Sequence, residues 1–82
     1  MRYDFRKLRD KIVEIFGKQE AFAHALGIST RSLSLKLNNE RYFKPNEISK
    51  AIELLGLAMT DIPAYFFAVE VQENKLPADA VH

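Results

Sequence analysis

Three glycines punctuate the chain, and each one follows a stretch whose apolar residues recur at three- and four-residue spacing. This spacing places apolar side chains along one face of a helix, and glycine readily takes the left-handed conformation that closes a helix. Gly17, Gly27 and Gly56 therefore predict three helices that end near them. Because 82 residues suffice for one domain and are too few for two, we expect a single helical bundle.

Residues that favour helix N-termini mark where the predicted helices begin. Asp4 and Ser29 are N-cap candidates, and Pro45 suits the first turn of a later helix. The predicted helices cover residues 5–16, 18–26, 30–38, 45–55 and a short stretch after Thr60 or Asp61 that includes Pro63, Tyr65 and Phe66. The expected fold class is all-α, a compact bundle of about five short helices.

The C-terminal part is less regular. We expect residues 1–67 to form the folded domain and residues 68–82 to form an extension or tail, frayed from Asn74 onward. The alternation of Val69 and Val71 also allows a short strand over residues 68–72, although a strand in a helical domain would need a partner.

Composition excludes several classes of protein. The chain lacks cysteine, a glycine-rich phosphate loop and paired histidines at metal-ligand spacing, so we expect no catalytic residue, metal or cofactor and no enzymatic activity. It also lacks an apolar run long enough for a membrane span or a signal peptide. These observations predict a cytoplasmic protein without a membrane partner.

The charges are divided unevenly along the chain. Residues 1–50 carry a net charge of +5 and residues 51–82 a net charge of −4, which together give the overall charge of +1. A basic half can face the phosphates of a nucleic acid while the acidic half faces solvent or a partner.

The residues around Gly27 follow a more specific pattern than two helices joined by a turn would require. Ala23 is small where the next helix would cross closely over it, Gly27 makes the turn, and Ile28 and Leu33 would lock two helices at a steep angle. This geometry would expose the front of the helix over residues 30–38, which could enter a major groove.

These residues carry a resemblance to a known family. The run from Gln19 to Asn38 resembles the helix-turn-helix of phage Cro and C1 repressor proteins and related XRE-like regulators, and the match extends over about residues 5–66. More narrowly, the chain is similar to small Cro-like proteins of phages and prophages of Gram-positive bacteria. The resemblance implies a lambda repressor-like domain that binds a double-stranded DNA operator, as a homodimer, in lysis-lysogeny control.

The resemblance also implies residue roles. Five residues on the front of the third helix would contact bases, with Arg31 the best placed for a guanine edge: Thr30, Arg31, Ser34, Leu35 and Asn38. Six others would contact phosphates, with the lysine at position 36 covering the core edge with its stem while its ammonium reaches solvent: Lys18, Gln19, Lys36, Asn39, Arg41 and Lys44.

Leu35 motivates an alternative from a different class of function. Helical phase places this leucine opposite the buried Leu33 and Leu37, where it could pack on thymine methyls or contact a protein. The alternative is a protein-binding antirepressor or modulator that uses the helix-turn-helix surface to engage a partner phage repressor.

The aromatic residues and His24 are expected to have structural roles rather than to bind a ligand. Five aromatic residues are expected in the core: Phe5, Phe16, Phe22, Tyr42 and Phe43. The three consecutive aromatics at 65–67 cannot all point inward from one helical turn, so at least one is expected on the surface and suited to a dimer contact. His24 is expected to be a surface or boundary residue rather than a ligand.

Overall fold

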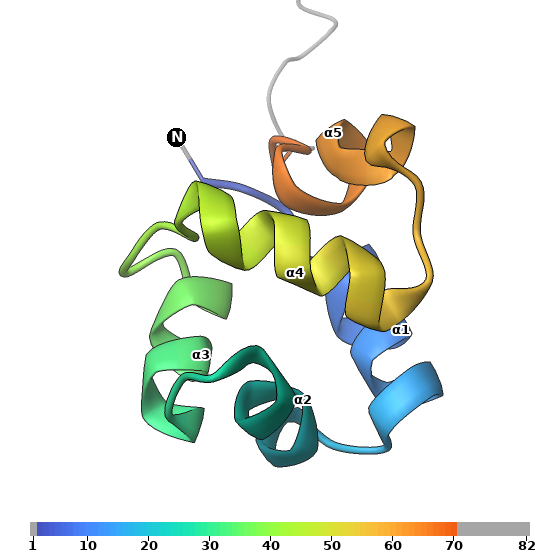
Figure 1. The fold of residues 1–82 in the computed structure, drawn as a ribbon. Helices are drawn as coiled ribbons and strands as arrows, with labels where there is room; N and C mark the ends of the chain where they lie inside the picture. The colour runs from blue at the N-terminus through green and yellow to red at the C-terminus, as the bar shows by residue number, and fades with distance from the viewer. Residues whose placement is uncertain (1, 71–82) are drawn as a thin grey trace, which may run out of the picture.

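The computed structural model describes residues 2–70, and these residues form the predicted all-α bundle (Figure 1). The helices are α1 (Arg6–Phe16), α2 (Gln19–Leu26), α3 (Thr30–Leu37), α4 (Pro45–Leu55) and α5 (Ile62–Phe66), with a 3-10 turn at Met59–Asp61. In Figure 1, α4 crosses the centre of the bundle with α2 and α3 on one side and α5 on the other. No helix within this part of the chain is long and apolar enough to cross a membrane.

The predicted helix ends are largely confirmed. Ser29 caps α3 by accepting a hydrogen bond from the Ser32 N–H at 3.0 Å, and Pro45 is the first residue of α4. The first helix differs by one residue, because Phe5 is its N-cap residue. Asp4 still stabilises the first turn, since its Oδ1 accepts the backbone N–H of Arg6 at 3.0 Å.

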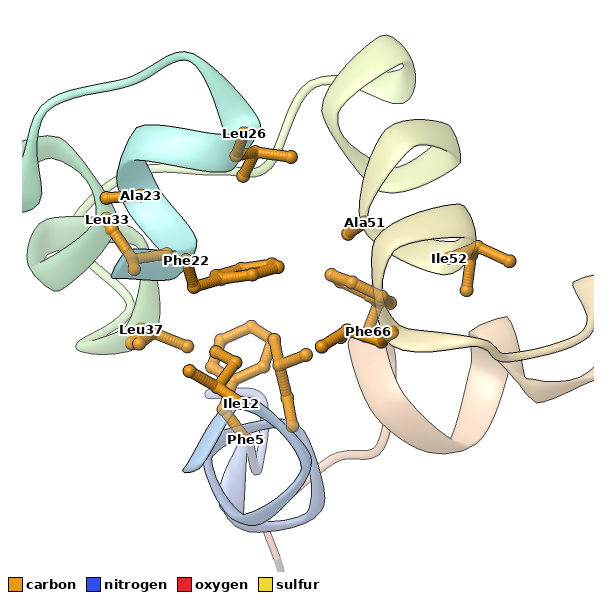
Figure 2. Close-up of a cluster of buried hydrophobic side chains, with 12 residues drawn as sticks. Phe5, Ile12, Phe22, Ala23, Leu26, Leu33, Leu37, Ala51, Ile52 and Phe66 are labelled. Atoms are coloured by element: carbon orange, nitrogen blue, oxygen red, sulfur yellow. The ribbon is translucent and has the colours of Figure 1, made fainter. Parts of the chain in front are cut away.

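The core lies where α1, α2, α3, α4 and α5 converge (Figure 2). Its largest fully buried side chains are Phe22, Phe66, Leu8, Ile12 and Leu33. Phe16 contacts Phe22 with ring centroids 5.3 Å apart, and Phe43 contacts Phe66 at 5.2 Å. These edge-on ring contacts join α1 to α2 and the loop between α3 and α4 to α5.

One of the five aromatic residues expected in the core is exposed. Tyr42 has 82% of its surface exposed, because it lies in the loop between α3 and α4, where no helical phase directs its side chain inward. Ile15, which follows Ile12 at three-residue spacing and so continues the apolar pattern of α1, is also 48% exposed. At this end of α1 it is Phe16 that reaches the ring of Phe22 in α2.

The segment after α5 turns back onto the N-terminal segment. Tyr3 and Val69 form an antiparallel bridge, flanked by hydrogen bonds from the Asp4 N–H to the Ala68 carbonyl at 2.6 Å and from the Glu70 N–H to the Arg2 carbonyl at 2.9 Å. The described part of the predicted 68–72 strand is therefore a single bridge. Residues 71–72 and the predicted tail from residue 74 lie outside the described residues.

Candidate interaction surface

The tight turn between α2 and α3 sets the position of α3. Ala23 is 1% exposed, and its carbonyl accepts the Gly27 N–H at 2.9 Å and the Ile28 N–H at 3.0 Å. Gly27 has a φ of 87°, which a residue with a Cβ rarely adopts. With Leu33 fully buried, the opposite side of α3 faces solvent, as the spacing predicts.

We call the five predicted base contacts the α3 front. Thr30, Arg31 and Asn38 are exposed, whereas Ser34 and Leu35 are half-buried. Within residues 2–70, Arg31 forms no ion pair. The α3 front thus combines one cation, neutral polar groups and one apolar side chain.

Four of the six residues predicted to contact phosphates are exposed or half-buried. Lys18, Arg41 and Lys44 are exposed, and Gln19 is half-buried at the start of α2. The Nζ of Lys18 lies 3.9 Å from a carboxylate oxygen of Glu20, and both side chains are more than two-thirds exposed. An exposed pair at this distance is weak, so the ammonium stays available.

Lys36 is not the surface lysine that the sequence suggested. It is 4% exposed, and its Nζ lies 3.0 Å from Oε1 of Glu47 and donates to the Tyr42 carbonyl at 3.1 Å. The same Glu47 oxygen accepts the backbone N–H of Lys44 at 2.9 Å. The ammonium therefore joins α3 to the start of α4 instead of reaching a phosphate.

Asn39, predicted to contact a phosphate, has a structural role in the domain. Its Oδ1 accepts the Tyr3 N–H at 2.7 Å, and its Nδ2 donates to the Tyr3 carbonyl at 3.0 Å. Asn39 has a φ of 66°, a left-handed conformation that asparagine tolerates better than most residues. Sequence reasoning missed both Glu47 and Tyr3, although Glu47 stands three residues after Lys44, the spacing of a capping box.

Two carboxylates have lowered pKa values. Burial alone would raise the pKa of Glu47, but the hydrogen bond from the Lys44 backbone and the ion pair with Lys36 hold it below its ordinary value. The side chain and backbone N–H of Arg6 lower the pKa of Asp4 to about 2. Both carboxylates are therefore charged at neutral pH.

These shifts predict a loss of stability in acid. A carboxylate with a lowered folded-state pKa stabilises the fold fully above its unfolded pKa and loses this contribution as the pH falls through the folded value. For Glu47 the loss should begin below pH 4.5, and for Asp4 it should extend to about pH 2. Thermal melting between pH 6 and pH ~2 should show this decline. The Glu47→Gln variant should show a shallower decline, whereas Glu53→Gln, on the exposed side of α4, should follow the wild type.

The fold and this surface define a small helix-turn-helix domain that presents the front of one short helix to solvent. The chain belongs to a family described as a protein of unknown function (DUF739), whose model matches residues 1–69. It is also similar to a solved structure, the modulator of repression (MOR) of the temperate bacteriophage TP901-1 from Lactococcus lactis. The two are 47% identical with a TM-score of 0.73, over 88% of this chain and 97% of that chain. No curated protein matches the chain.

The comparison tests the predicted resemblance to Cro and C1 regulators. It supports a small phage regulatory protein, and the relative is a modulator of repression rather than a Cro or C1 protein. The coarse part of the prediction is therefore confirmed, while the finer assignment to Cro and C1 regulators is not.

Proposed function

We propose that this chain is a phage-type modulator that acts by binding a repressor protein through the α3 front. The observation that carries the proposal is the similarity to a modulator of repression, at 47% identity over nearly the whole of that chain. Such a protein would act in the cytoplasm, where a repressor meets its operator, and would need neither a cofactor nor catalysis.

The surface geometry favours a protein partner over a DNA backbone. Affinity for DNA comes largely from cations that neutralise phosphates. Two of the expected phosphate contacts, Lys36 and Asn39, are occupied within the domain, and Asn38 bonds to Arg9. The centre of the α3 front is formed by Leu35 and Ser34, both half-buried. A half-buried leucine beside small polar groups suits the desolvated centre of a protein interface.

A pair of substitutions tests the proposal against the repressor of the same phage or prophage. Leu35→Asp should weaken repressor binding at least about tenfold, because it places a charge in the desolvated centre of the interface. Ser49→Asp adds the same charge on the exposed side of α4 and should bind as the wild type does. Calorimetric titration of the purified full chains measures both affinities, and thermal melting checks that each variant is folded.

Operator binding is the second candidate, and the exposed Arg31, without an ion pair in the described part of the chain, favours it. A guanidinium in this place can bond both acceptors of a guanine. If the second candidate holds, the chain should bind operator DNA as a homodimer at two half-sites. Arg31→Ala should then abolish competitor-resistant binding that weakens with salt, while Leu35→Asp leaves repressor binding unchanged. That combination of results would reverse our choice.

A further inference from the structure

A polar groove of about 390 Å³ lies beside the C-terminal end of α3, walled by the N-terminal segment and α1. We call it the arginine groove, because its charged and polar walls include Arg2, Arg6, Arg9 and Asn38, together with Asp4 and Glu70. None of these three arginines belongs to the α3 front. Since Asn38 belongs to the α3 front, the groove adjoins the surface proposed to meet the repressor.

Hydrogen bonds hold Arg9 in the wall of the arginine groove. Its Nη2 donates to the Leu37 carbonyl at 3.1 Å and to Oδ1 of Asn38 at 3.0 Å. Both acceptors are neutral, and Arg9 makes no ion pair with residues 2–70. The half-buried guanidinium is thus fixed in place while its positive charge stays uncompensated.

The contact with Arg9 also bears on what Asn38 can offer a ligand. Oδ1 of Asn38 already accepts from Arg9, and the amide NH2 group of this exposed side chain remains to donate to a ligand. An amide NH2 group donates hydrogen bonds, and a guanidinium does the same. The two neighbouring side chains therefore suit an acceptor that carries negative charge.

The remaining charges of the groove cancel in pairs. Arg6 lies 2.7 Å from a carboxylate oxygen of Asp4, and Arg2 lies 3.3 Å from one of Glu70. The groove therefore holds one excess positive charge, that of Arg9. One anionic group would neutralise it.

We propose that the arginine groove receives a single carboxylate, from an aspartate or glutamate side chain of the repressor. The inference rests on the proposed function. A DNA strand would bring a row of phosphates, but the other two arginines of the groove are already paired with Asp4 and Glu70, so only one phosphate would meet an excess positive charge. A lone acidic side chain matches this single charge, and apolar lining residues, Phe5 and Leu37 among them, suit its aliphatic stem.

Substitutions of Arg2 and of Glu70 should shift the affinity for the repressor in opposite directions. Arg2→Gln leaves Glu70 unneutralised and should weaken repressor binding about two- to fivefold, whereas Glu70→Gln raises the excess charge and should strengthen binding by a similar factor. If the pair served only to hold the fold, both substitutions would break the same ion pair and shift binding in the same direction. Titration of the full chains with the repressor at low salt measures both effects.

Arg9 provides the second part of the test. Arg9→Gln should weaken repressor binding about tenfold or more, because a partly buried charge-assisted hydrogen bond is lost. Arg9→Lys, which keeps the charge without the planar fork, should recover part of the affinity. Lys7→Gln removes the same charge from the exposed side of α1, outside the lining of the groove, and is the matched control.

The outcomes separate the two proposals. Repressor binding that none of the Arg2, Arg9 and Glu70 variants changes would overturn the groove assignment and leave the proposed function intact. Failure of the wild type to bind the repressor would overturn the proposed function, and the occupant of the groove with it. Nonspecific duplex DNA is titrated in parallel, and opposite shifts of DNA affinity with no shift of repressor affinity would overturn the choice of a carboxylate over a phosphate.

Discussion

Lys36→Met is expected to lower the free energy of unfolding by about 3 kcal/mol, the low end of the range for breaking a buried ion pair. Methionine keeps the aliphatic stem and removes the ammonium, which leaves Glu47, 8% exposed, without its charged partner. The Tyr42 carbonyl loses its donor as well. The effect stays at the low end because Glu47 keeps its hydrogen bond from the Lys44 backbone. Urea denaturation at pH 7 followed by circular dichroism measures it.

The double variant Lys36→Met with Glu47→Gln is the control for this prediction. Glutamine is neutral and can still accept the Lys44 N–H, so most of the lost stability should return, about 2 kcal/mol. This recovery would show that the cost of the single substitution comes from an unpaired buried carboxylate. A double variant as unstable as the single one would show that the charge of Glu47 is not the cause.

The helices could be predicted from the sequence because their signals are local. Ser29 caps α3 by reaching a backbone N–H three residues away, and Pro45 fixes the start of α4. The phases of Leu33 and Leu37 follow from helix geometry alone, and both are buried as predicted. Local rules of this kind depend on neighbours within one or two turns.

The contacts at the end of α3 and in the loop after it could not be predicted in the same way. Asn39 bonds to Tyr3, 36 residues earlier in the chain, and Lys36 in the last turn of α3 pairs with Glu47 at the start of α4. Both contacts join residues far apart in the sequence, so local patterns do not distinguish a surface lysine from a buried one. The error at Tyr42 has the same origin, because aromatic character predicts burial and the loop geometry overrides it.

The sequence alone could not decide between DNA and a protein as the partner. The spacing around Gly27 fixes which side of α3 faces solvent, but a helix front with Arg31 and Leu35 suits either a base edge or a protein surface. The sequence alone therefore allows both functions. The similarity to a modulator of repression favours the protein partner, and the contacts of Lys36 and Asn39 reduce the cations and donors left for DNA.

Asn39→Ala is expected to lower the free energy of unfolding by about 3 kcal/mol. The two hydrogen bonds to the backbone of Tyr3 contribute about 1 kcal/mol each. Alanine in the left-handed conformation at φ 66° adds about 1 kcal/mol of strain. The Tyr3 N–H and carbonyl lose their partner, so the N-terminal segment should also exchange its amide hydrogens faster. Denaturant unfolding and hydrogen exchange of the Tyr3 amide measure the two effects.

Two further substitutions at this position separate strain from hydrogen bonding. Asn39→Gly removes the side chain without the strain and should cost about 2 kcal/mol. Asn39→Asp keeps an acceptor for the Tyr3 N–H but cannot donate to the Tyr3 carbonyl, so it should lie between glycine and the wild type. If glycine and the wild type were equally stable, the side chain of Asn39 would not hold the N-terminal segment. The residue would then be available for a partner, as the sequence alone suggested.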